Sequence, residues 1–245
     1  MPAQKRKRSP ASAADPWEGQ DPNASKLAGL RRWAGKPATE AAVTELPARL
    51  LSADARESRA FLGLLCRRRR SEQAELDVAP RQVLDCGAGV GRGTQRVLLR
   101  LKGVERVDLL EPAARLRRRA RELLGGRRRV GRFLAQPLQD FTARTCYNLV
   151  WIQWVFMYIP DPEVVAFLQR CRLRLAPGGR VAVKENVEDR RYEDALDLED
   201  LCATRTAAHF EALFRQGGFK VALKRQQKVW DKRRFPLMMW GLVPS

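Results

Sequence analysis

Short apolar runs alternate with longer stretches of helical periodicity through most of the chain. Apolar runs of this kind predict strands, and strands that alternate with helices predict right-handed crossovers in a mostly parallel sheet. Pro177-Gly178-Gly179 predicts a turn that ends a helix and leads into a strand. The predicted strands are Gln82–Cys86, Arg106–Leu110, Val130–Ala135, Leu149–Trp154, Arg180–Lys184 and a final hairpin of Phe219–Lys224 and Phe235–Leu242.

The pattern is different before the first strand. Residues 1–25 mix charged, small and turn-forming residues without periodicity, which predicts a disordered basic arm. Residues 26–78 are helical in pattern, and Ser52 with Asp54 offers an N-cap for the helix that follows. We therefore expect a single domain over 26–245, in which a helical lid region (26–78) precedes an α/β core (79–245).

Composition limits the class of protein. A chain of 245 residues with 44% hydrophobic residues suits one globular α/β domain. It has no apolar run of membrane-spanning length, and its amino terminus is charged and does not resemble a signal peptide, so we expect a soluble intracellular monomer without a membrane partner. The five cysteines are odd in number and include no CxxC pair, which argues against disulfides and zinc and suggests small buried hydrophobic residues.

The formal net charge of +19 indicates acidic partners such as nucleic acid. Much of the charge lies in arginine runs at expected helix ends and loops, Arg67–Arg70, Arg117–Arg119 and Arg127–Arg129, where solvated charge is common. A generally basic surface is therefore favoured over a specific nucleic-acid site. Lys5-Arg6-Lys7-Arg8 is a candidate nuclear import signal, so we expect the protein in nucleus and cytoplasm.

The first predicted strand leads directly into a glycine-rich loop. Gly87, Gly89 and Gly91 alternate there, which lets the backbone turn sharply and approach a ligand. The dinucleotide pattern GxGxxG requires glycine at position 92, where this chain has Arg92, and no P-loop Lys-Ser/Thr follows. The GxGxG spacing after Asp85 resembles motif I of the S-adenosylmethionine-dependent methyltransferases, whose Rossmann-like sheet has seven strands.

Other polar residues follow the ends of the predicted strands, where ligands of open α/β sheets bind. Arg92 could pair with a carboxylate of the cofactor. Strand two is expected to end at Asp108, with Glu111 three residues later, and either acid could accept hydrogen bonds from ribose hydroxyls or lie on the surface. Gln139-Asp140 follows the third strand, where methyltransferases hold the adenine amino group.

Trp151-Ile152-Gln153-Trp154 closes the fourth predicted strand and opens onto the same site. The Asn/Asp-Pro-Pro-aromatic motif of nucleic-acid amino methylases is missing from this chain, and so is a Pro-Cys nucleophile. Four segments carry a resemblance to a known family, namely the glycine loop, Leu138-Gln139-Asp140-Phe141, Trp151-Ile152-Gln153-Trp154 and Val183-Lys184-Glu185-Asn186. The chain resembles the protein α-N-terminal methyltransferases, which recognise Xaa-Pro-Lys or Xaa-Pro-Arg termini. The resemblance runs from about Arg81 to the carboxyl end.

The resemblance implies a mostly parallel sheet with an antiparallel last strand, helices on both faces, and S-adenosylmethionine as cofactor. It implies that Trp154 packs on the substrate proline and that Asn186 binds the first residue's backbone. Trp33 would cap the site, and Asp197 and Asp200, in an acidic stretch after Asn186, would attract the basic terminus. The implied cofactor residues are Gly87, Gly89, Arg92, Asp108, Leu109, Leu110, Leu138, Gln139 and Gln153.

The chain departs from the family pattern at two places. Tyr158 stands where the family has a histidine, and His209 falls in a later predicted helix, so Asp200 or water held by Tyr158 would take up the amine proton. The family has a glycine-rich lid after an aromatic-Trp pair, whereas here Arg32-Trp33 is followed by Ala41–Leu46 without a glycine, so this lid is expected to fold differently. Two alternatives therefore stay open: a methyltransferase acting on another amine or RNA, and a cofactor-binding homologue with reduced or lost catalysis.

Overall fold

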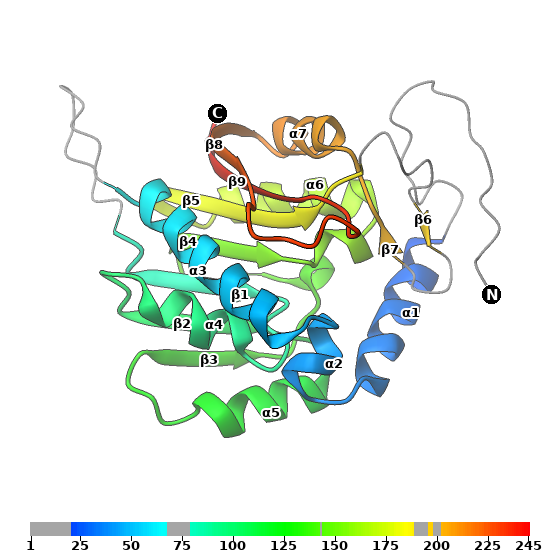
Figure 1. Ribbon diagram of the computed structural model, residues 1–245. Coiled ribbons are helices and arrows are strands. Elements are labelled where there is room, and N and C mark those ends of the chain that lie inside the picture. Colours follow the sequence, from blue (N-terminus) through cyan, green and yellow to red (C-terminus); the bar gives the residue numbers. More distant parts are fainter. Residues whose placement is uncertain (1–20, 68–78, 143, 189–195, 198–201) are drawn as a thin grey trace.

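The computed structural model describes residues 21–67, 79–142, 144–188, 196–197 and 202–245. Its centre is a seven-stranded sheet with the order β3-β2-β1-β4-β5-β9-β8 (Figure 1). Strands β1 to β5 are parallel to their neighbours in that order, whereas β9 is antiparallel to both β5 and β8. The strands are β1 (Gln82–Cys86), β2 (Arg106–Leu110), β3 (Val130–Leu134), β4 (Tyr147–Gln153), β5 (Leu175–Asn186), β8 (Phe219–Gln226) and β9 (Leu237–Pro244), with β6 (Leu196–Asp197) and β7 (Cys202–Ala203) forming a separate pair.

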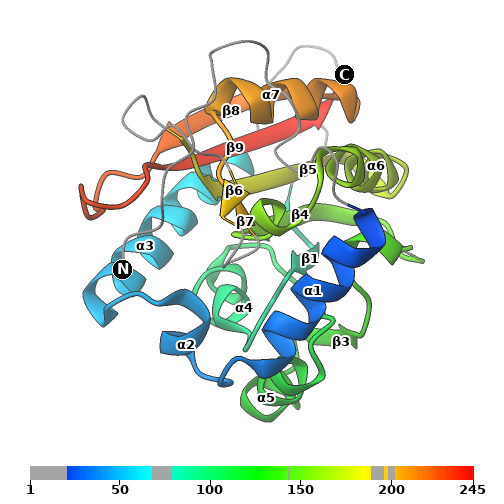
Figure 2. The same cartoon turned by 90° about the vertical axis from the view of Figure 1, so that its right-hand side faces the viewer.

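Helices cover both faces of this sheet (Figures 1 and 2). The predicted seven-stranded, mostly parallel fold with an N-terminal helical extension is confirmed, although the first helix begins within the expected disordered arm, of which residues 1–20 lie outside the described part. The helices are α1 (Pro22–Gly35), α2 (Glu40–Thr44), α3 (Ala48–Leu65), α4 (Arg92–Arg96), α5 (Ala114–Leu124), α6 (Asp161–Arg172) and α7 (Ala207–Gln216), with 3-10 turns η1 (Leu98–Arg100), η2 (Leu138–Asp140) and η3 (Phe156–Tyr158).

The central strands are apolar at nearly every position because both of their faces are buried. In β4, Val150 and Ile152 pack in one core with α6 and α7, whereas Leu149 and Trp151 pack in a second core with α3 and α5. Successive strand residues point to opposite faces, which divides the β4 side chains between the two cores. The continuous apolar runs of the sequence are thereby explained.

Helix α3 lies across the sheet and includes Ser52 and Asp54, which were expected to form its N-cap. It begins at Ala48 after Pro47, so Ser52 and Asp54 lie inside the helix and the predicted N-cap is wrong. Asp54 is fully buried. The carboxyl end of α3 packs against β9 at Gly241, where a Cβ would overlap the Leu65 side chain. The N-terminal extension is therefore part of the core packing.

The Pro177-Gly178-Gly179 segment lies inside β5 and does not precede it. The register of β4 with β5 moves from Tyr147 opposite Leu175 to Leu149 opposite Arg180, so extra β5 residues form an irregularity. Gly178 has a φ of 71°, which allows the chain to bend there without leaving the sheet. The expected turn is thus a bulge within a longer strand.

All five cysteines are described and have free thiols, in agreement with the absence of disulfides predicted from the sequence. Cys86 and Cys171 are buried, but Cys146 is exposed, so the interpretation as buried hydrophobic residues is wrong for that position. Among the described residues, no helix combines the length and apolar character needed to cross a membrane.

Candidate active site

A cavity of about 300 Å³ lies at the carboxyl ends of β1, β2 and β4. Figure 2 faces this end of the sheet and shows α1 and α2 in front of it. Ligands of open α/β sheets bind at this end because the crossover helices leave a crevice there. The predicted site residues that line the cavity are Trp33, Gly87, Gly89, Arg92, Leu138, Gln139, Gln153, Trp154, Tyr158 and Asn186.

The loop after β1 exposes its backbone to the cavity. Gly87, Gly89 and Gly91 have φ values of 63°, 55° and 85°, a region that glycine adopts without a steric cost. A Cβ on Gly87 would also lie 2.5 Å from Cγ2 of Val155. The N–H of Gly89 donates to Oε2 of Glu111 at 2.9 Å, which holds the loop against the end of β2.

The predicted strand Arg106–Leu110 is confirmed, but the expectation that Asp108 stands at its end is wrong. Strand β2 continues to Leu110, and Asp108 lies inside it with 1% exposure. Arg132 and the hydroxyl of Tyr147 donate hydrogen bonds to its carboxylate, and it does not line the cavity. Leu109 and Leu110 are core residues with exposures of 1% and 0%, so none of these three expected cofactor residues reaches the site.

Glu111 is the acid that the structure places in the cavity at the end of β2. Its carboxylate accepts hydrogen bonds from the N–H groups of Gly89 and Ala113, at 2.9 and 2.8 Å. Burial raises the pKa of Glu111, and these two hydrogen bonds oppose the rise. The apolar run of β2 ends at Leu110, so Glu111 is the first polar residue after the run, and this is the sequence signal for the acid that lines the cavity.

A buried ionic cluster holds the next two cavity residues. Nη1 of Arg92 donates to Oδ2 of Asp54 at 2.6 Å, and Nε2 of Gln153 donates to Oδ1 of the same carboxylate at 3.0 Å. Lys184 pairs with Asp54 at 2.5 Å and also donates to Ser58. Burial opposes ionisation of Asp54, but Lys184 and Arg92 outweigh it and hold the pKa of Asp54 below its usual value. Asp54 therefore joins α3 to the site.

The turn after β3 forms another wall of the cavity. Leu138 and Gln139 lie in η2, and Nη2 of Arg170 in α6 donates to both of their carbonyl oxygens at 2.9 and 3.0 Å. Lys26 of α1 donates to Asp140 of the same turn. These contacts fix the turn between α6 and the N-terminal extension, so the predicted adenine-side residues occupy a rigid wall.

Aromatic rings surround the deep end of the cavity. Trp154 directly follows β4 with a φ of 56°, an unusual conformation for a residue with a bulky side chain. The guanidinium of Arg92 lies 5.3 Å from the centroid of the Trp154 ring. Trp33 of α1 meets Tyr158 edge to face with centroids 5.3 Å apart. The first helix therefore supplies one cap of the site.

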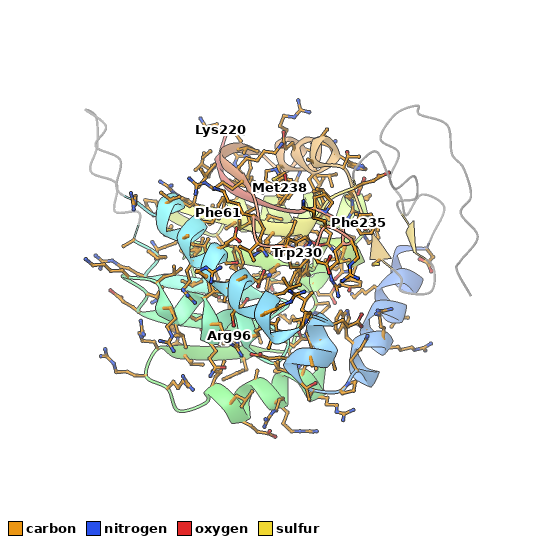
Figure 3. The ribbon with its side chains drawn as sticks, viewed as in Figure 1. Phe61, Arg96, Lys220, Trp230, Phe235 and Met238 are labelled. Carbon is orange, nitrogen blue, oxygen red and sulfur yellow. The ribbon has the colours of Figure 1, made fainter. Side chains whose placement is uncertain are left out.

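Trp230 and Arg234 in the β8–β9 connection also line the cavity and were not predicted. Trp230 lies 6.2 Å from Trp154, centroid to centroid, and donates through Nε1 to the carbonyl of Phe235 at 2.8 Å. Figure 3 labels Trp230 and Phe235 on this connection. Glu57 of α3 accepts hydrogen bonds from two backbone N–H groups of the connection, which anchors it. No periodicity or motif in the sequence brings this polar hairpin to the site.

A short helix, α2, lies where the family pattern has a glycine-rich lid. Thr39 caps α2 by accepting a hydrogen bond from the N–H of Ala42. Val43 lines the cavity and its Cγ1 lies 3.3 Å from a Cβ built on Gly89.

Three residues that line the cavity carry buried polar atoms that are unpaired in the part of the chain that the structure describes. Within the described residues, Oε1 of Gln153, Nε1 of Trp154 and Oδ1 of Asn186 are buried without a hydrogen-bond partner. Buried polar groups of this kind are satisfied in nearly all native proteins, so these atoms indicate a polar ligand. The backbone of Asp197 pairs with Cys202, a cavity residue, whereas Asp200 lies outside the described residues.

Glu185 holds the loop that carries Trp154 through hydrogen bonds to its backbone. Its Oε1 accepts hydrogen bonds from the N–H groups of Val155 and Phe156, at 2.7 and 2.8 Å. The carboxyl is fully buried, and burial raises its pKa to about 7 against the opposing effect of these N–H donors. This support maintains the strained backbone of Trp154.

His209 belongs to a second buried network behind the same loop. Its Nε2 lies 2.5 Å from Asp161, whose other oxygen accepts a hydrogen bond from Arg205 at 2.6 Å. Arg205 in turn donates to the carbonyls of Phe156 and Ile159. The histidine therefore acts in the core and does not line the cavity, as expected from its place in a later helix.

The described residues hold no cluster of histidine, cysteine or carboxylate side chains suited to a metal ion. The site instead combines a backbone cradle, a carboxylate, a guanidinium and an aromatic wall. Such a set can bind a ligand that carries a hydroxylated ring and a carboxylate, and can hold a second molecule against Trp154.

Comparison with known proteins gives consistent matches. Residues 21–243 match the family model of AdoMet-dependent proline di-methyltransferases. The chain is 37% identical over 165 residues to alpha N-terminal protein methyltransferase 1 of Arabidopsis thaliana, an alignment that covers 65% of this chain but 58% of that protein. It thus spans less than two thirds of that relative's length. It is 36% identical over 152 residues to N-terminal Xaa-Pro-Lys N-methyltransferase 1-B of Xenopus laevis, covering 61% and 66% of the two chains.

The fold matches a solved relative over nearly its full length. A SAM-dependent methyltransferase from Leishmania major superposes with a TM-score of 0.77 at 30% identity, over 94% of this chain and 87% of the other. The match over 21–243 covers most of the sequence and includes the whole described cavity. This chain belongs to the family of AdoMet-dependent proline di-methyltransferases.

Proposed function

We propose that this protein transfers a methyl group from S-adenosylmethionine to the α-amino group of proteins that begin with Xaa-Pro-Lys or Xaa-Pro-Arg. The observation that carries the proposal is the single cavity in which the glycine loop and Glu111 lie beside Trp154 and Asn186. The relatives named as N-terminal methyltransferases support the same activity.

The cavity residues fit the cofactor. Glu111 would accept hydrogen bonds from the ribose hydroxyls, Arg92 would pair with the carboxylate, and Leu138 with Gln139 would hold the adenine. Oε1 of Gln153, which is buried without a partner among the described residues, suits the ammonium group of the same ligand. When bound, S-adenosylmethionine supplies the electrophilic methyl group.

Trp154 and Asn186 would place the acceptor. The ring of Trp154 offers a flat apolar surface for the substrate proline, and Oδ1 of Asn186 would accept a hydrogen bond from the terminal amine or its backbone. The amine nitrogen forms the new N–C bond while the C–S bond breaks, and the electron pair of that bond stays on sulfur. Catalysis in such a site is mainly positioning.

One proton must leave the amine. An α-amino group has an unperturbed pKa of about 7.7 to 8.0, so part of the substrate is already neutral at physiological pH. Asp200 or a water molecule held by Tyr158 would take the proton from the remainder. Asp197 and Asp200 would also attract the cationic terminus and the following Lys or Arg.

The test is mass spectrometry of a Ser-Pro-Lys peptide incubated with the protein and S-adenosylmethionine. We expect methylation confined to the α-amine, and the Asn186→Ala variant is expected to lower kcat/KM roughly tenfold through the loss of one hydrogen bond to a charged group. A peptide with an acetylated terminus is the control, since it keeps the lysine but offers no α-amine. Methylation of that control would contradict the proposal.

A second candidate function is favoured by Tyr158, which packs against Trp33 where the family pattern has a histidine. In this alternative the protein binds the cofactor without transferring its methyl group. Measurable binding of S-adenosylhomocysteine with no methylation of either peptide would support it. Transfer to RNA under the same conditions would instead favour a related methyltransferase of different specificity.

We further propose that the protein is a monomer of the nucleus and cytoplasm. Lys5-Arg6-Lys7-Arg8, which lies outside the described residues, supports nuclear import. Loss of nuclear fluorescence from a tagged protein after Lys5-Arg6-Lys7-Arg8 is changed to alanines would test the location, and light scattering would test the monomer.

A further inference from the structure

Asp54 is a buried carboxylate that the N-terminal extension delivers to the cofactor side of the cavity. It lies in the middle of α3 with 0% exposure. Its carboxylate accepts hydrogen bonds from Nη1 of Arg92 at 2.6 Å and from Nε2 of Gln153 at 3.0 and 3.1 Å. It also forms an ion pair with Nζ of Lys184 at 2.5 Å. Two of these three partners, Arg92 and Gln153, line the cavity.

Asp54 shares one carboxylate between two cations, Arg92 and Lys184, and all three groups are buried in the protein. One shared carboxylate leaves donors of these cations available to a further anion, which is favoured beside the cluster. Lys184 is enclosed by Asp54, Ser58 and Gln227, whereas Arg92 borders the cavity, so the anion is expected at Arg92.

The orientation of Arg92 is fixed on two sides. Nη1 donates to Asp54, and Cζ of the guanidinium lies over the ring of Trp154, 5.3 Å from its centroid. A guanidinium presents five donors in a rigid fork, so these two contacts together restrict the direction of its opposite edge. That edge can then receive a carboxylate in a bidentate manner.

A second buried acid competes for the same arginine. Asp85 accepts a hydrogen bond from Thr94 at 2.6 Å and lines the cavity, and the charge of Arg92 acts on it. Of these two acids, Asp54 is the one that accepts a hydrogen bond from Arg92, so the charge of Asp54 holds the guanidinium in the observed orientation.

We infer that Asp54 is a positioning residue, which holds Arg92 with the outer edge of its guanidinium toward the carboxylate of S-adenosylmethionine. The inference rests on the proposed function, because it assumes that cofactor. The N-terminal extension thereby contributes to cofactor affinity through a residue that does not touch the cofactor.

The test is the affinity for S-adenosylhomocysteine, measured by calorimetry on the full-length chain. Asp54→Asn retains a side-chain oxygen that can accept from Gln153 but removes the charge that holds Arg92. We expect at least tenfold weaker binding, with a raised KM for S-adenosylmethionine and a nearly unchanged kcat at saturation. The matched control is Ser58→Ala, which removes a hydrogen bond of Lys184 and leaves the Asp54–Arg92 pair intact. Its affinity should stay within twofold of the parent.

A double-mutant cycle separates positioning from a general structural role. In an Arg92→Met background, Asp54→Asn should change the affinity less than twofold, because the residue through which Asp54 acts is gone. An undiminished loss in that background would overturn the inference. If Asp54→Asn alone does not fold because Lys184 is left uncompensated, the same comparison is made with Asp54→Asn/Lys184→Met, which returns the net charge of the Asp54, Arg92 and Lys184 cluster to its value in the parent.

The two proposals fail in different ways. If the unmodified protein does not bind S-adenosylhomocysteine, the proposed function fails. If it binds and Asp54→Asn binds equally well, only the role of Asp54 is overturned.

Discussion

Single buried acids determine the geometry of the site at the residue scale. Glu185 accepts the N–H groups of Val155 and Phe156 and so holds the loop in which Trp154 has its left-handed backbone. Backbone strain of this kind costs about 1–3 kcal/mol and persists where surrounding contacts enforce it. Glu185 supplies such contacts, although it does not face the substrate.

Glu185 also predicts a pH dependence of stability. Burial raises its pKa from 4.5 to about 7, so the folded protein retains a proton that the unfolded chain has released between these values. The contribution of Glu185 is therefore fully present below pH 4.5 and is lost as the pH rises through 7. Glu185→Gln does not show this loss. Its free energy of unfolding, taken relative to the parent, should therefore rise by on the order of 3 kcal/mol from pH 4.5 to pH 8. Urea denaturation at both pH values measures the difference.

Glu211→Gln is the control of opposite sign. Burial opposes ionisation of Glu211, but hydrogen bonds and charge from Lys224 with Trp240 outweigh it and lower its pKa. Its contribution is present above the unfolded pKa and lost as the pH falls, so this variant should lose stability relative to the parent as the pH rises. A Glu185→Gln variant that tracks the parent at every pH would contradict a proton on Glu185.

Individual side chains were the part of the site that sequence reasoning located least well. Asp108 and Glu111 both follow apolar residues, but only Glu111 lies beyond the whole strand Arg106–Leu110, so the end of that strand distinguishes them. Asp54 resembles an N-cap residue in sequence, because Asp is common there, yet its ionic partners come from positions 92 and 184. Long-range pairings of this type leave no local pattern.

The strands and the glycine loop were predictable at the element scale, because their signals are local. Apolar runs and glycine spacing report burial and backbone shape directly. The β8–β9 connection was not predictable as a site wall, because Trp230 reaches the cavity only through the packing of that hairpin on α3. The same packing makes α3 a structural partner of β9.

The contact between α3 and β9 predicts stability changes of opposite sign when two glycines are replaced by alanine. Gly241 is buried against Leu65, so Gly241→Ala inserts a methyl group into filled space and should lower stability by roughly 1–3 kcal/mol. Gly63 is exposed in α3 with nothing within 4 Å of a built Cβ, so Gly63→Ala should raise stability by about 0.5–1 kcal/mol. The measurement is the midpoint of urea denaturation. Equal shifts for both variants would contradict the close approach of α3 to β9.

Charge is the dominant property of the whole molecule. The chain has 47 Lys and Arg against 28 Asp and Glu, a net charge of +19. Exposed arginines gather on α5 and the connection to β3, at positions 115, 118, 119, 121, 127 and 128. Like charges at this density repel each other in the folded state more than in the expanded chain, which lowers stability at low ionic strength. Exposed ion pairs such as Lys26–Asp140 act in the opposite direction but contribute at most about 1 kcal/mol each.

Net repulsion and ion pairing predict opposite responses to salt, and the charge excess decides the sign. Raising KCl from 0.01 M to 0.1 M shortens the screening length from about 30 Å to about 10 Å, which suppresses repulsion between separated arginines more than contacts within a pair. We expect Tm to rise by roughly 2–4 °C, which corresponds to about 1 kcal/mol for a domain of this size. Because the effect arises from the arginine surface, Arg127→Gln/Arg128→Gln should raise Tm at 0.01 M KCl and reduce the salt-induced rise, whereas a fall in Tm with salt would mean that the ion pairs outweigh the net charge.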